Sequence, residues 1–129
     1  MVRPRTVSES TFRILVVEDE TLVALLLEEL LSTLGCEVVG PVPTLDEGLE
    51  HAIGDGFDAA LLDVNLGGQR SHPIAELLAA RGKPFAYATG YGSYGVRDED
   101  LDRPLLLKPF TRKELAKVVD ELKALCAGA

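Results

Sequence analysis

Five short apolar runs, each followed by a helical or loop-forming stretch, constrain the fold of this chain more than any other feature. They lie at residues 14–17, 38–39, 59–62, 85–88 and 105–107. The first run is continuous and rich in β-branched residues, as strands buried on both faces of a sheet are. Strands that alternate with helices form a parallel sheet covered by helices. The sequence therefore predicts an α/β fold with parallel strands.

Helical signals are clear at four places and weak at a fifth. Two capping boxes, Thr44 with Glu47 and Thr111 with Glu114, predict helix starts, and another helix is expected from about residue 71. In the helix predicted over residues 21–34, an apolar stripe indicates the face turned to the core. It consists of leucines that recur every four residues, Leu22, Leu26, Leu30 and Leu34, and is widened by Leu25 and Leu31. Residues 93–103 are polar and weakly periodic, so we expect a loose loop or a poorly held helix there.

The length and charge of the chain limit what it does. Its 129 residues suit one domain, and we expect a flexible tail over residues 1–11 and a folded domain over residues 12–127. With 13 basic and 21 acidic residues the net charge is −8, which argues against binding nucleic acid or an anionic membrane. Cys36 and Cys126 form no CxxC pair, so we expect free thiols in a reducing cytoplasm.

Chemically active residue types stand directly after four of the five runs. Glu18 and Asp19 follow the first, Asp63 the third, Thr89 the fourth and Lys108 the fifth. In an open parallel sheet, ligands bind beyond the carboxyl ends of the strands. We therefore expect carboxylates, a hydroxyl and an amine to meet at a single edge of the sheet.

Crowded carboxylates need a counter-charge, because each pair repels by on the order of 4 kcal/mol at about 4 Å and an effective dielectric near 20. Lys108 supplies one positive charge and a divalent cation supplies two. Oxygen ligands from a few side chains suit Mg²⁺. A carboxylate beside Mg²⁺ is able to attack phosphorus, and the cations would neutralise the transferring phosphoryl group.

Four segments resemble the signatures of response-regulator receiver domains. They are VVEDE at 16–20, LLDVN at 61–65, ATG at 88–90 and LKPF at 107–110. They occur in the order of that family, each at the end of a predicted strand, and the match spans about residues 13–125. The resemblance implies a flavodoxin-like, doubly wound sheet of five parallel strands in the order 2-1-3-4-5.

The same resemblance implies a role for each residue at the sheet edge. Asp63 would accept a phosphoryl group from a histidine kinase or a histidine phosphotransfer protein. Asp19, Asp63 and the backbone carbonyl of Asn65 would bind Mg²⁺ directly, and Glu18 would act on it through water. Thr89 would hydrogen-bond the phosphoryl oxygens, and Lys108 would pair with them.

A narrower resemblance lies in PFAYATGYG, residues 84–92, which is similar to the receivers marked by the run Phe-Ala-Thr-Gly-Tyr and called FAT GUY receivers. Tyr87 stands at the position of the first Phe of that run. The subfamily implies a single-domain protein phosphorylated by kinases of the HWE and related families, with a poorly formed fourth helix. Gly90, Tyr91 and Gly92 then form a candidate switch loop after Thr89.

Two positions differ from the common receiver pattern. Leu105 stands three residues before Lys108, where many receivers have an aromatic ring that changes rotamer on activation. Tyr91, two residues after Thr89, is the nearest substitute. Glu18 replaces the commoner Asp, which would shift the metal ligands slightly.

We therefore expect a cytoplasmic receiver rather than an enzyme, phosphorylated on Asp63 with Mg²⁺. Because the chain ends at Ala129, soon after the last predicted helix, we expect its output to be changed protein–protein binding or onward phosphotransfer.

Three alternatives use the same features. A phosphatase of the haloacid dehalogenase type has similar residues, but it would have a second Asp where this chain has Asn65 and a nucleophile on the first strand. A non-phosphorylated interaction module on the same fold has no need of Asp63, Thr89 and Lys108. Residues 90–95 fit the GxGxxG pattern of dinucleotide sites, but no firm helix is predicted after them.

Overall fold

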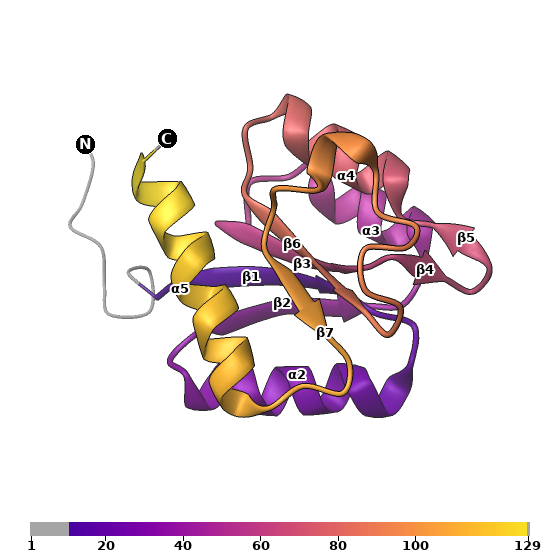
Figure 1. Cartoon of the computed structure of the whole chain (residues 1–129). Helices are drawn as coiled ribbons and strands as arrows, with labels where there is room; N and C mark the ends of the chain where they lie inside the picture. The colour runs from indigo at the N-terminus through magenta and orange to yellow at the C-terminus, as the bar shows by residue number, and fades with distance from the viewer. Residues whose placement is uncertain (1–10, 129) are drawn as a thin grey trace.

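The computed structural model describes residues 11–128 (Figure 1), so nearly all of the tail expected over residues 1–11 lies outside the described part. Its main sheet is parallel and contains β1 (Arg13–Val17), β2 (Glu37–Val42), β3 (Ala59–Asp63), β6 (Phe85–Thr89) and β7 (Leu105–Leu107). The strands lie in the order β2-β1-β3-β6-β7. Counted along the chain within this sheet, that order is 2-1-3-4-5, which confirms the predicted fold.

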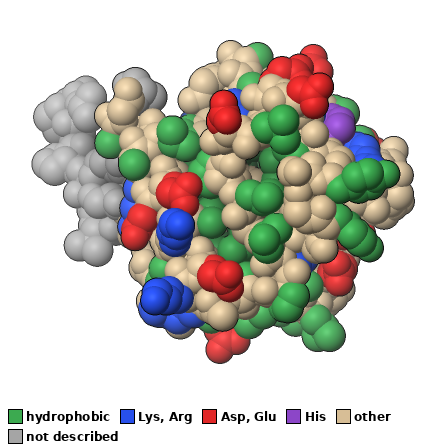
Figure 2. Space-filling view, in the orientation of Figure 1, with side chains coloured by type: hydrophobic (Ala, Val, Ile, Leu, Met, Phe, Trp, Pro, Cys, Tyr) green, Lys and Arg blue, Asp and Glu red, His purple; other side chains and the backbone are tan. Residues whose placement is uncertain are grey.

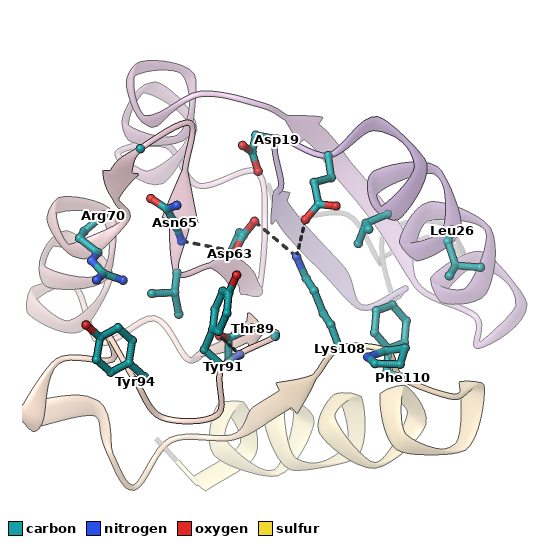
Figure 3. Close-up of a pocket in the computed structure, with 16 residues that line it drawn as sticks. Asp19, Leu26, Asp63, Asn65, Arg70, Thr89, Tyr91, Tyr94, Lys108 and Phe110 are labelled. Carbon is teal, nitrogen blue, oxygen red and sulfur yellow. Dashed lines mark hydrogen bonds and ion pairs between the residues drawn. The ribbon is translucent and has the colours of Figure 1, made fainter.

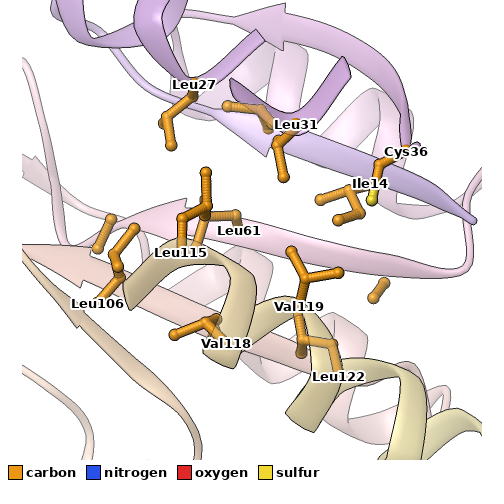
Figure 4. Packing of buried hydrophobic residues seen from close by; sticks show 14 residues of the cluster. Ile14, Leu27, Leu31, Cys36, Leu61, Leu106, Leu115, Val118, Val119 and Leu122 are labelled. Carbon is orange, nitrogen blue, oxygen red and sulfur yellow. The ribbon is translucent and has the colours of Figure 1, made fainter. Parts of the chain in front are cut away.

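Helices cover both faces of the sheet (Figure 1). α2 (Thr21–Thr33) and α5 (Arg112–Gly128) pack on one face, and α3 (Leu45–Ala52) and α4 (His72–Ala80) pack on the other. Because successive strand residues point to opposite faces, Ile14 and Val16 join the first layer (Figure 4), whereas Leu15 and Val17 join the second. Burial on both sides explains why the strand is continuously apolar. None of the helices described in residues 11–128 is long and apolar enough to cross a membrane.

The predicted leucine stripe of α2 marks its buried face only in part. Leu31 is buried, and Leu30 and Leu34 pack against the core, but the other members of the stripe are exposed. Leu22 is 82% exposed and Leu26 is 43% exposed, whereas Leu27 and Leu31 are buried. Leucine or another apolar residue occurs on almost every side of this helix. Periodicity therefore could not select the face that the sheet covers.

Both predicted capping boxes begin helices. Thr44 Oγ1 accepts a hydrogen bond from the Glu47 backbone N–H at 3.1 Å. At the start of α5 the arrangement is reciprocal, since the Glu114 N–H donates to Thr111 Oγ1 at 3.1 Å and the Thr111 N–H donates to Glu114 Oε1 at 2.8 Å. These bonds satisfy N–H groups that a helix leaves unpaired, and α5 therefore begins four residues after Lys108.

The segment after β3, expected as a plain loop, forms a small antiparallel hairpin. β4 (Asn65–Leu66) pairs with β5 (Gln69–Arg70) through a turn of Gly67 and Gly68. Both glycines have positive φ, 58° and 90°, as a two-residue hairpin turn of the tightest kind requires. The hairpin brings Arg70 opposite Asn65 at the carboxyl edge of the sheet.

The segment between β6 and β7 contains no α-helix, in agreement with the weak periodicity, and holds only the short η1 (Asp98–Asp100). Its distal end is nevertheless well anchored. Asp100, 1% exposed, accepts hydrogen bonds from Tyr87 Oη at 2.7 Å, Arg97 Nε at 2.7 Å and Arg103 Nε at 2.8 Å. Burial alone would raise the pKa of Asp100, but these donors outweigh it and the pKa lies below its ordinary value.

We predict that this buried cluster stabilises the fold strongly. Asp100→Asn removes the charge that two arginines share, and should lower the free energy of unfolding by about 3 kcal/mol. Tyr87→Phe removes one hydrogen bond and should cost about 1–2 kcal/mol. Asp98→Asn, an exposed acid of the same short helix, is the matched control and should stay within about 0.5 kcal/mol of the wild type. Urea unfolding measures all three, and an Asp100→Asn protein as stable as the control would contradict the prediction.

Candidate functional site

A cleft of about 870 Å³ opens at the carboxyl edge of the sheet (Figure 3). Asp19, Asp63, Thr89 and Lys108, which follow or end four different strands, all line it. The predicted meeting of these side chains is therefore confirmed in space. Leu26 and Phe110 form one side of the cleft, and residues of the β4–β5 hairpin and of the segment after Thr89 form the other.

Lys108 lies at the centre of a group of carboxylates. Its Nζ is 2.8 Å from Glu18 Oε1, 3.4 Å from Asp63 Oδ2 and 3.6 Å from Glu20 Oε1. Burial by itself lowers the pKa of Lys108, but the bond to Glu18 and the charges of Asp63, Glu18 and Glu20 outweigh it, so the pKa is raised. The ammonium group is therefore charged at every physiological pH.

Asp63, at the end of β3, is 8% exposed and faces the cleft. Its Oδ1 accepts a hydrogen bond from the Asn65 backbone N–H at 3.3 Å. Burial and the adjacent Glu18 carboxylate raise the pKa of Asp63 to about 7, against the lowering effect of Lys108. The positive charge of Lys108 is thus not enough to offset the effects of burial and of Glu18 on the pKa of Asp63.

The four carboxylates at this edge of the sheet do not all belong to one cluster. Oxygens of Glu18, Glu20 and Asp63 lie within 4.8 Å of one another. Asp19 lines the same cleft, but its Oδ2 accepts a hydrogen bond from the Gly67 N–H at 2.9 Å. Glu20, the residue before α2, is a member of the cluster that the sequence reasoning did not single out, because an acid at the start of a helix is common for other reasons. This set of oxygens fits Mg²⁺.

Thr89 is 2% exposed, and its Oγ1 accepts a hydrogen bond from the Tyr91 backbone N–H at 3.0 Å. Gly90, Tyr91 and Gly92 continue from it along the rim, and Tyr91 is 81% exposed. The structure therefore joins Thr89 directly to the predicted switch loop. No α-helix follows residues 90–95, all of which are described, so the dinucleotide interpretation of GxGxxG loses its second requirement.

The raised pKa of Asp63 predicts a specific pH dependence. In the unfolded chain the pKa is near 3.8, and in the folded protein it is about 7. The folded state therefore binds the proton more tightly, and the stability that this contributes is lost as the pH rises through about 7. In metal-free buffer, raising the pH from 5 to 8 should cost the wild type about 2–3 kcal/mol more than Asp63→Asn. Urea unfolding of both proteins with a chelator checks this, and parallel pH profiles would contradict it.

Comparison with curated proteins gives distant matches, and no family model matches the sequence. The chain is 27% identical over 113 residues to the sensory transduction protein LytR of Staphylococcus haemolyticus, covering 84% of this chain and 44% of LytR. Sensory transduction protein LytT of Bacillus anthracis is 29% identical over 115 residues, covering 86% of this chain and 47% of LytT. The chain thus spans about half the length of the curated relatives that it matches.

Solved structures give stronger matches. SdrG from Sphingomonas melonis Fr1 is 46% identical with a TM-score of 0.79, covering 88% of this chain and 97% of SdrG. Its BeF₃-activated conformation, described from Pseudomonas melonis Fr1, is 47% identical with a TM-score of 0.74, at 88% and 98% coverage.

Two further structures are described as receiver domains. A CheY-like response regulator receiver domain protein from Methanospirillum hungatei JF-1 is 25% identical with a TM-score of 0.78, covering 93% of this chain and all of that one. The receiver domain of sensor histidine kinase PA1611 from Pseudomonas aeruginosa PAO1, with magnesium in its active site cleft, is 23% identical with a TM-score of 0.73, at 92% and 99% coverage. At that identity the PA1611 match concerns the fold alone. Given the identity to SdrG over almost its whole length, the sheet order and the acidic cleft with its lysine, this chain belongs to the receiver domains of two-component response regulators.

Proposed function

We propose that Asp63 is a phosphoryl acceptor, and that the chain is a signalling receiver rather than an enzyme that turns over small substrates. The observation that carries this proposal is the position of Lys108 Nζ, 3.4 Å from the carboxylate of Asp63 in an open cleft. A lysine in that place neutralises charge on a phosphoryl group as it arrives. The BeF₃-activated conformation of SdrG supports the proposal.

The chemical step is a transfer between two nucleophiles. An oxygen of the ionised Asp63 attacks the phosphorus of a phosphohistidine, the P–N bond breaks, and the imidazole leaves with the electron pair of that bond. Lys108 holds charge on the phosphoryl oxygens, and Thr89 donates its hydroxyl hydrogen to one of them. That hydroxyl also accepts from the Tyr91 N–H. Because a hydroxyl accepts and donates at the same time, Thr89 would link the phosphoryl group to the backbone of Tyr91.

Mg²⁺ is the proposed cofactor. It would be held by Asp19, Asp63 and the backbone carbonyl of Asn65, with Glu18 acting through water, and it supplies a double positive charge for the phosphoryl oxygens. The cluster of Glu18, Glu20 and Asp63 oxygens supports a cation here, as does the magnesium described for the receiver of PA1611. A bound cation would also lower the pKa of Asp63, which burial and the adjacent Glu18 carboxylate raise.

The finer assignment that we propose is the FAT GUY subfamily, with a receiver domain over residues 12–127. It is supported by the segment at residues 84–92, by the identity to SdrG and by the short η1 in place of a fourth helix. On this assignment the phosphodonor is a histidine kinase, including kinases of the HWE type, or a histidine phosphotransfer protein. The cytoplasm remains the predicted location.

The proposed output is a change in protein–protein binding or onward phosphotransfer. Gly90, Tyr91 and Gly92 begin the segment between β6 and β7 and follow Thr89 directly. In this proposal Tyr91 acts in place of the aromatic switch residue, because Leu105 stands at the usual position of that ring. Figure 2 shows hydrophobic side chains in the middle of the face that carries β7. Leu107, 50% exposed, and Leu101, 55% exposed, are apolar contacts that a partner would cover.

The phosphatase alternative fits the structure less well. Asp63 ends β3, and β3 lies inside the sheet between β1 and β6. The position two residues later holds Asn65, which offers no carboxylate to protonate a leaving group. The intact cleft equally disfavours a module that never takes up phosphate.

We predict that phosphorylation requires Asp63. With radiolabelled acetyl phosphate and Mg²⁺, the wild type should become labelled and Asp63→Asn should retain less than about 5% of the label, because the nucleophilic oxygen is gone. Asp46→Asn, an exposed acid on α3, controls for loss of a negative charge and should label like the wild type. Equal labelling of Asp63→Asn would contradict the assignment.

We also predict an order among the acids for metal binding. Asp19→Asn should weaken Mg²⁺ binding by about tenfold or more, since it removes a charged ligand at the strand end. Glu20→Gln should weaken it less than about threefold, because the Glu20 side chain is 64% exposed and interacts with Mg²⁺ mainly through its charge. Titration calorimetry on the three proteins measures this, and the reverse order would show that Glu20 is the ligand.

A further inference from the structure

Among the described residues, two cationic side chains line the cleft, and they differ in how many carboxylates lie at ion-pair distance. Lys108 already has three carboxylates within 3.6 Å. Arg70 also lines the cleft, yet within residues 11–128 no carboxylate lies at ion-pair distance from its guanidinium. Of these two cations, Arg70 is therefore the one that forms no ion pair with a described residue.

The hairpin register places Arg70 beside the phosphorylation site. Arg70 pairs across the hairpin with Asn65, and the Asn65 N–H donates to Asp63 Oδ1 at 3.3 Å. Figure 3 shows Arg70 and Lys108 on opposite sides of Asp63, with Asn65 between Arg70 and Asp63. Arg70 is exposed and lines the same cleft as Asp63, so rotation about the bonds of its long side chain would turn the guanidinium toward that carboxylate.

In the present structure Arg70 rests on the segment that follows Thr89. Its guanidinium carbon lies 5.8 Å from the centre of the Tyr94 ring, and a Cβ on Gly95 would overlap its Nη1. The Gly95 carbonyl is held separately, since it accepts a hydrogen bond from His72 Nε2 at 2.6 Å. The contact with Tyr94 is a cation–π interaction at an exposed ring, which is weaker than a guanidinium–phosphate pair.

Phosphorylation changes the charge that these cations face. A phosphoryl group carries about −2 where the Asp63 carboxylate carried −1, and Lys108 is shared with Glu18 and Glu20. The excess negative charge is best met by a cation with free donors. A guanidinium presents two parallel N–H groups that match two phosphoryl oxygens.

We propose that Arg70 is a phosphoryl-binding residue. When Asp63 carries a phosphoryl group, the guanidinium leaves the Tyr94 ring and binds phosphoryl oxygens from the side of the cleft opposite Lys108. This inference rests on the proposed phosphorylation of Asp63 and adds a residue to it. Tyr94, 74% exposed, is then released from the hairpin, so one movement both holds the phosphoryl group and frees an aromatic side chain next to the Thr89 loop.

The test uses beryllofluoride, BeF₃⁻, as a probe of the phosphorylated state, with the whole chain and saturating Mg²⁺. We expect Arg70→Gln to weaken BeF₃⁻ binding by about tenfold, and Arg70→Lys by about threefold because it keeps the charge without the planar fork. Lys113→Gln removes a charge from an exposed position on α5 and should bind BeF₃⁻ like the wild type. Amide NMR signals of Thr89 and Gly90 report the binding.

A second measurement separates phosphoryl binding from a merely structural role. Mg²⁺ affinity without BeF₃⁻ should be the same within about twofold in Arg70→Gln and the wild type, since Arg70 acts on the phosphoryl group and not on the metal. The Nε–H signal of Arg70 should shift when BeF₃⁻ is added to the wild type. Wild-type affinity for BeF₃⁻ in Arg70→Gln, or an unmoved Nε–H signal, overturns the role of Arg70 and leaves the proposed function intact. Failure of the wild type to bind BeF₃⁻ overturns the proposed function itself.

Discussion

The ion pairing of Lys108 is the interaction on which the carboxyl edge of this molecule depends. The ammonium group follows β7, and the carboxylates that it contacts belong to β3 and to the segment that leaves β1. These strands are not all neighbours in the sheet, since β6 separates β3 from β7. One half-buried cation therefore contacts carboxylates at strand ends that backbone hydrogen bonds do not join directly. Without it, carboxylates in a space of a few ångströms would have no counter-charge.

The single positive charge of Lys108 does not balance the negative charges of the carboxylates around it, and this imbalance favours a further cation at the site. Lys108 offers one positive charge to Glu18, Glu20 and Asp63. Burial and the adjacent Glu18 carboxylate both disfavour ionisation of Asp63 and raise its pKa, and a divalent cation would act against both effects. A site that is short of positive charge favours a divalent cation, and in the proposed function Mg²⁺ there would keep Asp63 ionised for attack on phosphorus. The same electrostatics link metal binding, the pKa of Asp63 and the response of nearby cations.

The segment between β6 and β7 has a buried anchor at its distal end and only local, exposed contacts at its proximal end. Tyr87 and Asp100 fix its distal part to the sheet through a buried hydrogen bond. Its proximal part depends on the local bond from the Tyr91 N–H to Thr89 and on the contact of Tyr94 with Arg70. Weak, exposed contacts of this kind exchange easily, whereas the buried cluster does not. A change at Thr89 is therefore confined to the part of the surface beside the cleft.

Most of the sheet and the members of its active edge were predictable from the sequence. Apolar runs bounded by polar residues marked the strands, and the parallel arrangement carried Asp19, Asp63, Thr89 and Lys108 to one edge. Other features could not be predicted, because they depend on partners distant in sequence or on a choice among equivalent faces. The buried face of α2 is one, since this helix is apolar on several sides. The role of Asp100 is another, because a short acidic stretch gives no sign that Tyr87 lies above it.

The sequence by itself determined where strands and helices begin and which chemical groups stand at the strand ends, because hydrophobic period and capping are local properties. Only the tertiary structure decided how those groups share their charges. It placed Glu20 in the carboxylate cluster and turned Asp19 toward Gly67. It also set Arg70 opposite Asn65, where no carboxylate of residues 11–128 lies at ion-pair distance from it. The physical reason is that electrostatic interaction falls with distance in space, and distances in space are set by how the elements pack and not by their order along the chain.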